Sequence, residues 1–305
     1  MELGTLETVG SAKLLIVLII LAGASIMDLR YRRIPDRFWI IMIIFAYPLL
    51  AWEMWLKGAR DSPVTLLSLL LPGTGFLFII FGYPEPKEVL KGSASDIVFT
   101  LIYLGAIIGG AVAFFLGDRS LLTEVGISLI FMTVYFVLYT VPIAGARLIH
   151  GGADAKCLIS LAALFPWYIT DLPFQLGPFY STMKDIPALG TIFPVHLSIL
   201  FNAAVISALV VILMIPLINI LKGNLQGLRP TSYMADVEGL EGKFVWIMEN
   251  KEKSDPTSRA IRRLKERGVD RVRVTPKIPF IMYLALGAVA HAILGNLVVA
   301  VILHI

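Results

Sequence analysis

Charged residues and cysteines are both scarce in this sequence of 305 residues. Asp, Glu, Lys and Arg make up only 16% of it and 57% of the residues are hydrophobic, whereas soluble domains have about 25% charged residues. So few charges exclude a large soluble catalytic domain and indicate an integral membrane protein. The single cysteine, Cys157, excludes a disulfide framework and the several sulfurs of a paired zinc or redox site.

Metal-ligand spacing and internal repeats are also missing. His196, His291 and His304 are scattered along the chain, so we expect no metal centre, and nothing in the sequence indicates an organic cofactor or a nucleic-acid partner. His150 and Cys157 are close in sequence, but no third group orients a Cys-His nucleophile, which favours a packing role. The lack of a repeat argues against an inverted-repeat transporter.

Long apolar runs are what the sequence has instead. A transmembrane helix needs about 20 apolar residues, and eight runs approach this length, of which the sixth is short and contains Lys156. We therefore predict an all-α polytopic membrane protein with about eight transmembrane helices. Trp52, Trp55 and Trp167 lie near the ends of runs and are interpreted as interfacial anchors. The predicted spans are residues 11–29, 38–56, 64–82, 97–116, 121–144, 154–169, 195–221 and 279–303.

The distribution of positive charge predicts the orientation. If the loop after the first run faces the cytoplasm, most of the 26 Lys and Arg residues fall on that side, as expected from the excess of Lys and Arg in cytoplasmic loops. This places both termini outside and residues 222–278 in the cytoplasm. We thus expect a multi-pass protein of the cell (plasma) membrane, surrounded by the lipid bilayer, and its oligomeric state stays open.

Residues 222–278 are the only stretch polar enough for a water-facing subdomain. Apolar residues alternate in two short segments of it, as in strands, and recur at helical spacing between them. We predict a small cytoplasmic α/β subdomain here, between a membrane domain of residues 1–221 and a final transmembrane helix within 279–305. The β-α-β unit expected inside it has a strand at 245–248, a helix over 257–267 and a strand over 269–274.

Two carboxylates lie at the edges of apolar runs, where burial of a charge is costly. Asp28 ends the first run and Asp154 opens the sixth. In the predicted topology both are at the cytoplasmic boundary, so they can meet although they are far apart in sequence. Two carboxylates in one site share a single proton near neutral pH. The ionised one then draws a proton from water while the protonated one polarises a carbonyl, as amide hydrolysis requires.

Small residues precede the second carboxylate. Gly151, Gly152 and Ala153 leave space for a peptide backbone to approach closely. The residues alone leave three roles open for the two carboxylates: a catalytic pair, a helix cap or ion-pair partner of nearby arginines, and a proton relay. Lys156 either keeps Asp154 ionised, contacts a backbone carbonyl, or extends into water as a lysine at a helix end commonly does.

Two segments around these carboxylates resemble a known family. Asp-Leu-Arg-Tyr-Arg-Arg-Ile-Pro at 28–35 and Gly-Gly-Ala-Asp-Ala-Lys at 151–156 are similar to the signature motifs of the type IV prepilin peptidases, which are membrane aspartyl proteases with a GxGD motif. The archaeal preflagellin (archaellin) peptidase branch is the most similar, and residues 240–246 resemble the C-terminal region of archaeal members. The resemblance implies a catalytic dyad formed by Asp28 and Asp154.

The resemblance also implies a substrate and a place of action. Such enzymes remove the short basic leader from archaellin or type IV pilin-like precursors at the cytoplasmic membrane face, without a cofactor. Gly151, Gly152, Ala153 and Lys156 then become substrate-binding or supporting residues. Three features depart from the family. Ala153 stands where glycine is usual, about two helices between 58 and 120 look inserted, and the zinc-type tetracysteine loop is absent, so methyltransferase activity is not expected.

Two functions of other classes stay as alternatives. A proton-coupled membrane transporter would use Asp28 and Asp154 as a proton relay, and it predicts carboxylates at mid-depth and related halves. A non-enzymatic membrane subunit would dock partners or anionic lipid through its basic tail, and both aspartates would be dispensable. Because both acids lie at the ends of spans and the halves are unlike, the sequence favours the protease.

Overall fold

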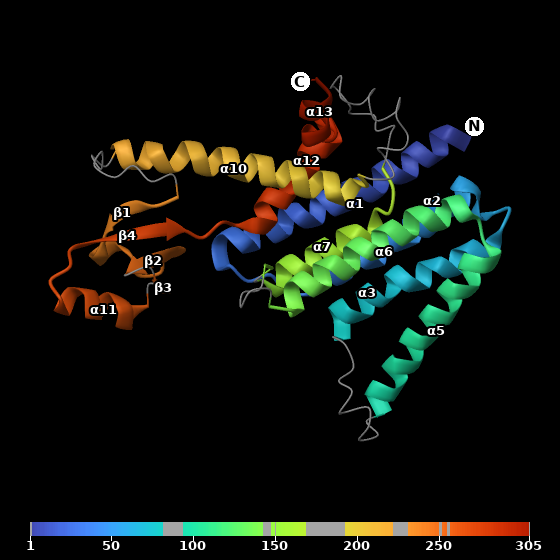
Figure 1. Cartoon of the computed structure of the whole chain (residues 1–305), viewed down its shortest axis with the longest axis horizontal. Helices are drawn as coiled ribbons and strands as arrows, with labels where there is room; N and C mark the ends of the chain where they lie inside the picture. Colours follow the sequence, from blue (N-terminus) through green and yellow to red (C-terminus); the bar gives the residue numbers. More distant parts are fainter. Residues whose placement is uncertain are drawn as a thin grey trace. The chain divides into compact units, whose positions relative to one another are not determined.

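The computed structural model describes residues 2–81, 94–142, 148–149, 151–168, 193–221, 231–249, 252–254 and 257–304. Its helices and strands form two compact units (Figure 1). Met1–Ala203 together with Phe280–Ile305 makes the first unit, and Ala204–Pro279 makes the second. The chain therefore leaves the first unit within α10 (Val195–Leu221) and returns to it at the start of α12 (Phe280–Leu294).

Helices dominate the first unit. In it α1 packs against both α2 and α12, and α6 lies beside α7 (Figure 1). A π-helical turn, Trp55–Ala59, extends α2, and a 3-10 helix, Pro63–Leu69, precedes α3. The other helices are α1 (Glu2–Tyr31), α2 (Arg37–Met54), α3 (Leu70–Phe81), α5 (Ala94–Leu116), α6 (Arg119–Thr140), α7 (Gly152–Leu164) and α13 (Leu297–His304).

Five helices are long and apolar enough to cross a membrane. A mostly helical fold with long apolar helices of the kind that a membrane protein needs is therefore confirmed, whereas eight spans are not. A helix is present at each of the eight predicted positions, but three of the described helices there are short. The five spanning segments are Leu6–Tyr31, Arg37–Ala59, Asp96–Leu116, Arg119–Thr140 and Val195–Leu221.

The three shorter helices have local causes. The segment predicted over 64–82 begins as a 3-10 helix, so that α3 has only 12 residues. The helix predicted over 154–169 stops at Leu164, because Phe165 precedes a proline and such a residue is disfavoured in the helical conformation. The predicted last span is interrupted after Leu294 by Gly295, whose φ of +78° suits glycine.

Polar side chains of α10 stabilise the interruption between α12 and α13. Asn202 donates a hydrogen bond to the Gly295 carbonyl at 2.8 Å and accepts one from the Leu297 N–H at 2.9 Å. Asn296 in turn donates to the Ser198 hydroxyl at 3.0 Å. Backbone groups freed at a helix break must find partners away from water, so these contacts allow the break inside the first unit.

The second unit carries a four-stranded antiparallel sheet in the order β1-β4-β2-β3. Strands and a helix are present where the sequence predicts them, at β2, α11 and β4. The predicted β-α-β arrangement is wrong, because β2 and β4 pair antiparallel, with Ile247 opposite Val274. A hairpin to β3 reverses the chain before the helix. The elements are β1 (Tyr233–Asp236), β2 (Val245–Glu249), β3 (Glu252–Ser254), α11 (Ser258–Glu266) and β4 (Arg271–Pro276).

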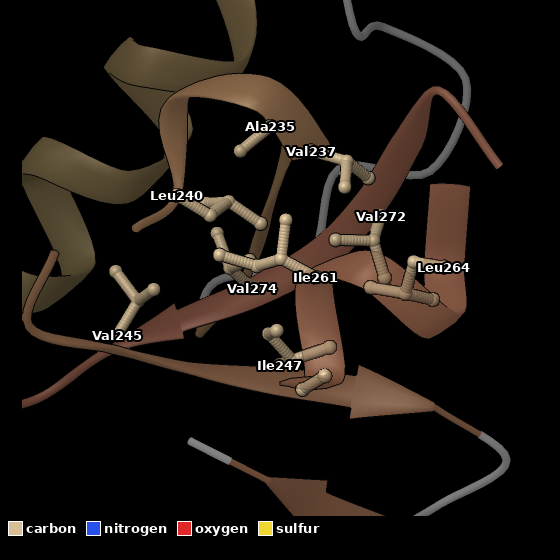
Figure 2. Close-up of a cluster of buried hydrophobic side chains, with 10 residues drawn as sticks. Ala235, Val237, Leu240, Val245, Ile247, Ile261, Leu264, Val272 and Val274 are labelled. Atoms are coloured by element: carbon tan, nitrogen blue, oxygen red, sulfur yellow. The ribbon is translucent and has the colours of Figure 1, made fainter. Parts of the chain in front are cut away.

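One face of α11 closes the core of the second unit. Ile261 and Leu264 point at the sheet, where Ile247, Val272 and Val274 lie buried below them (Figure 2). Each fully buried aliphatic side chain contributes about 1.5–3 kcal/mol. The opposite face of the helix is charged and exposed, as expected of a surface that faces water.

Candidate active site

The first motif segment lies where α1 ends. Asp28 is in the last turn of α1 and accepts a hydrogen bond from the Ile281 N–H at 3.2 Å, at the start of α12. Arg32 follows in the left-handed conformation, with φ of +53°, and its guanidinium lies 3.8 Å from the Asp28 carboxylate. A non-glycine residue in this conformation is strained. Holding Arg32 beside Asp28 therefore costs conformational free energy.

The second motif segment forms the start of α7. Gly151 is the N-cap residue of α7, and Asp154 stands in its first turn. A Cβ added at Gly151 would overlap the Asp154 carboxylate, so this side chain folds back over the N-cap. A Cβ added at Gly152 would lie 3.3 Å from the Tyr139 hydroxyl of α6. A side chain at either position would therefore have to displace a neighbour, the Asp154 carboxylate at Gly151 or the Tyr139 hydroxyl at Gly152.

Asp28 and Asp154 act on one another electrostatically. Asp154 lies outside the five spanning helices, and its carboxyl pKa is raised to about 7. Burial is the main cause, and the negative charge of Asp28 adds to it, while the positive charge of Arg32 opposes both. Asp154 forms no ion pair with any residue that the structure describes. The charges of Asp28 and Arg32 at the end of α1 thus act on Asp154 at the start of α7.

The remaining predicted site residues lie close to Asp154 in sequence. Ala153 is half-buried in the first turn of α7. Lys156 forms an ion pair with Asp36 at 2.8 Å rather than with Asp154. Cys157 is fully buried, and burial together with the charge of Asp154 raises the pKa of its thiol well above the usual value, so the thiol stays protonated. His150 lies outside the described residues.

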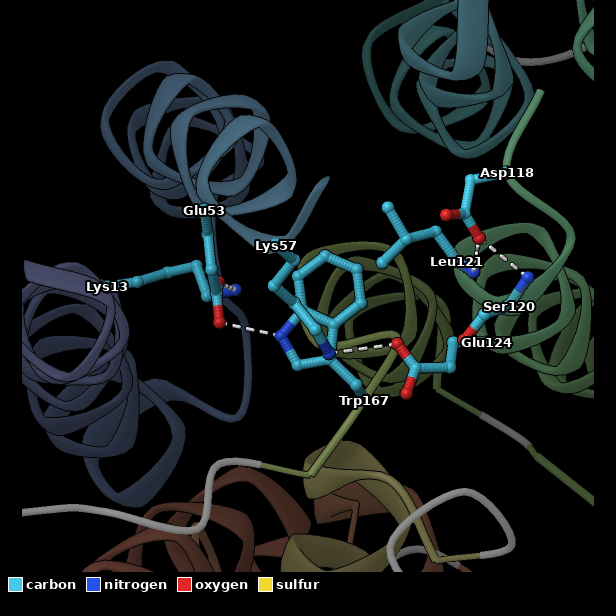
Figure 3. A network of polar contacts seen from close by, with 8 residues as sticks. All are labelled: Lys13, Glu53, Lys57, Asp118, Ser120, Leu121, Glu124 and Trp167. Carbon is cyan, nitrogen blue, oxygen red and sulfur yellow. Dashed lines mark hydrogen bonds and ion pairs between the residues drawn. The ribbon is translucent and has the colours of Figure 1, made fainter. Parts of the chain in front are cut away.

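A second charged cluster was not anticipated from the sequence. Lys13 and Glu53 form an ion pair in which both side chains are almost fully buried. The Trp167 indole donates a hydrogen bond to Glu53 at 2.6 Å (Figure 3). Lys57 lies over the Trp167 ring, 4.3 Å from its centroid, and pairs with Glu124 at 2.9 Å. We refer to these five residues as the lysine–glutamate network.

The lysine–glutamate network shows that one interpretation of the sequence is wrong. The sequence also contained a sign that such a network exists. Trp167 is only 2% exposed, so its assignment as an interfacial anchor is wrong, whereas Trp52 is 51% exposed. Lys13 and Glu53 both stand inside predicted apolar spans. Charges there are rare and require partners, so the two residues could have been picked out as a pair.

An apolar cavity adjoins α7 further along the helix. It has a volume of about 390 Å³ and lies between α3, α5, α6 and α7, with Ile159 in its wall. The hydroxyls of Thr74, Thr100 and Thr133 also line it, but each donates to a carbonyl of its own helix, at 2.6, 2.7 and 2.8 Å. The wall therefore suits apolar groups.

Comparisons with other proteins add no identification. No family model, curated protein or solved structure matches this chain. Among the described residues, no three His, Cys, Asp or Glu side chains are grouped as a metal ion would need. The chemistry of the site must therefore be argued from its carboxylates, its arginine and its small residues.

Proposed function

We propose that this protein is a membrane aspartyl endopeptidase of the prepilin and preflagellin peptidase type. The observation that carries the proposal is the electrostatic interaction of Asp28 with Asp154, which come from two helix ends far apart in sequence. Pairs of titratable groups with perturbed pKa values are typical of acid–base sites. The motif resemblance described above supplies the reaction class.

The two carboxylates have different surroundings, which favours different roles. Asp28 lies beside Arg32 and a backbone N–H, so it is the ionised partner. Asp154, with a pKa of about 7, carries the shared proton near neutral pH. Asp28 removes a proton from water, the oxygen of that water attacks the scissile carbonyl carbon, and Asp154 gives its proton to the carbonyl oxygen. Return of a proton to the amide nitrogen then breaks the C–N bond.

The surroundings of the dyad support a peptide substrate. Gly151 and Gly152 add no side chains of their own beside Asp154, so an extended backbone gains access to it once the Asp154 carboxylate moves out from over the N-cap. Ile159, five residues further along α7, lines the apolar cavity, which suits a precursor in which an apolar helix follows the leader. The substrates we propose are archaellin or type IV pilin-like precursors, cut on the side of the membrane that the Lys and Arg distribution assigns to the cytoplasm.

A cleavage assay tests the proposal. Membranes containing wild-type protein, Asp28→Asn or Asp154→Asn are mixed with an archaellin or pilin precursor, and loss of the leader is measured by mass spectrometry. We expect each variant to be at least about 100-fold slower, because each removes an acid–base group. Asp61→Asn, at a carboxylate whose side chain is 81% exposed, is the matched control and should cleave normally. Cleavage at the wild-type rate by either dyad variant would contradict the assignment.

One observation favours a second candidate, a proton-coupled membrane transporter. Lys13 and Glu53 are ionisable residues buried inside two spanning segments, where such residues often mark ion pathways. This function predicts pH-driven flux in proteoliposomes, which the double variant Lys13→Met/Glu53→Gln abolishes because it removes both buried ionisable groups. Flux without cleavage by the wild-type protein would replace the protease assignment.

A further inference from the structure

A half-exposed ion pair joins the two motif segments. Lys156 Nζ lies 2.8 Å from Asp36 Oδ1. Lys156 stands two residues after Asp154 on α7, and Asp36 stands in the turn between α1 and α2, shortly after Asp28 and Arg32. The pair is thus a direct link between the chain segments that carry the two carboxylates.

Asp36 makes this contact in place of a local one. It occupies the N-cap position of α2, where an Asp carboxylate ordinarily accepts a hydrogen bond from a backbone N–H of the first turn. The Asp36 side chain makes no capping hydrogen bond. Its φ of -60° and ψ of -22° are helical, whereas a capping residue is typically extended, so its carboxylate is free to pair with Lys156 and ties the turn after α1 to α7.

We propose that the Asp36–Lys156 ion pair positions Asp154 against Asp28. The inference rests on the proposed function, and it makes Asp36 and Lys156 positioning residues that act through the dyad. An ion pair of this exposure changes an equilibrium constant by a factor of about 1.5 to 5. The pair therefore adjusts the fraction of molecules in which the two carboxylates are together.

The charged and titratable groups around Asp154 determine how its pKa responds when the Asp36–Lys156 ion pair is broken. The charges that shift the pKa of Asp154 are those of Asp28 and Arg32. Among the described residues, further titratable groups near this site include Cys157 on α7, Tyr139 of α6, whose hydroxyl lies beside Gly152, and Tyr283 of α12, on which the charge of Arg32 acts. Asp36, the residue before α2, pairs with Lys156 of α7.

Neutralising Lys156 separates positioning from a local charge effect. Loss of a nearby positive charge alone would raise the pKa of Asp154. Loss of positioning lowers it, because the carboxylate moves away from Asp28 and into better solvated surroundings. Lys156→Gln therefore gives opposite shifts under the two explanations.

Two measurements on the full chain in proteoliposomes test the pair. The first is kcat/KM for precursor cleavage, and the second is the infrared titration of the Asp154 carboxyl band, identified by its loss in Asp154→Asn. For Lys156→Gln and Asp36→Asn we expect a loss of about 1.5- to 5-fold in kcat/KM and an Asp154 pKa below about 7. The exchanged variant Asp36→Lys/Lys156→Asp should restore both, as should the conservative variant Lys156→Arg.

The Lys57–Glu124 pair is the matched control, since it has a similar length of 2.9 Å and a lysine of similar exposure in another part of the first unit. Glu124→Gln should leave the pKa of Asp154 unchanged. An upward or absent shift in Lys156→Gln, or an exchanged variant as impaired as the single ones, would overturn the inference. If the wild-type protein cleaves no precursor, the proposed function fails, and the infrared titration still decides whether the pair positions Asp154.

Discussion

The first unit contains two charged clusters that differ in how completely their charges are balanced. In the lysine–glutamate network, Glu53 pairs with Lys13 and accepts the Trp167 N–H, and Lys57 pairs with Glu124. At the dyad, two carboxylates share one arginine, and its contact to Asp28 is long, at 3.8 Å. A complete set of partners indicates a structural role, whereas an excess of one charge keeps a group ready to exchange a proton.

The largest expected effect would come from unbalancing the network. Lys13→Met or Glu53→Gln alone leaves one buried charge without its partner, which costs about 3–5 kcal/mol of stability. The double variant Lys13→Met/Glu53→Gln removes both charges and still offers an acceptor to Trp167, so it should recover most of that loss. Unfolding in detergent micelles measures both effects. If the double variant were as unstable as the single variants, charge balance would not explain the stability of the network. The contrast between the network and the dyad would then fail.

A smaller effect is expected from crowding the dyad. The Cβ of Gly151→Ala would overlap the Asp154 carboxylate and displace it. Misplacement of a reacting group by about 1 Å lowers rates by up to about 100-fold, so we expect cleavage to fall about 10- to 100-fold. Gly126→Ala is the matched control, because a Cβ there has no neighbour within 4 Å. Unchanged kcat/KM in Gly151→Ala would show that Asp154 acts in another conformation.

A third expected effect is the pH dependence of stability at the dyad. The pKa of Asp154 is raised from 3.8 to about 7 on folding, so between these values the folded state binds more protons than the unfolded state. Stability then decreases as pH rises through this window and is constant above it. Asp154→Asn should match the wild type near pH 4 and exceed it in melting temperature near pH 8. If Asp154→Asn and the wild type differed in melting temperature by the same amount at both pH values, the raised pKa would be contradicted.

The same proton sets the expected pH dependence of cleavage. Above about pH 7 Asp154 loses its proton, and the dyad then has no acid to give to the carbonyl oxygen. Cleavage rates should therefore fall on the alkaline side.

Much of the fold could be predicted because its signals are local. Apolar runs predict helices at the right positions, and alternation predicts β2 and β4. The lengths were less predictable, since α7 stops before Pro166 and α12 stops at Gly295. The direction of strand pairing was not predictable, because alternation is the same in parallel and antiparallel strands.

Some residues of the candidate site could likewise be predicted from local sequence, whereas other features depended on tertiary contacts. Asp28 and Asp154 can be selected because a carboxylate at the end of an apolar run is unusual, and the motifs around them can be compared with a family. The partner of Lys156 could not be selected, since Asp154, water and Asp36 are all compatible with its position in the sequence. Trp167 near the end of an apolar run is compatible with an interface or a core, and only its neighbours place it in the core.

The sequence by itself determines that this is a mostly helical membrane protein with a small polar unit, because hydropathy and periodicity act over neighbouring residues. The tertiary structure alone decides which charges meet: Lys13 with Glu53, Lys156 with Asp36, and the charge of Asp28 with Asp154. The physical reason is that electrostatic interactions depend on distance in space and on burial, and both are set by how helices far apart in sequence pack together.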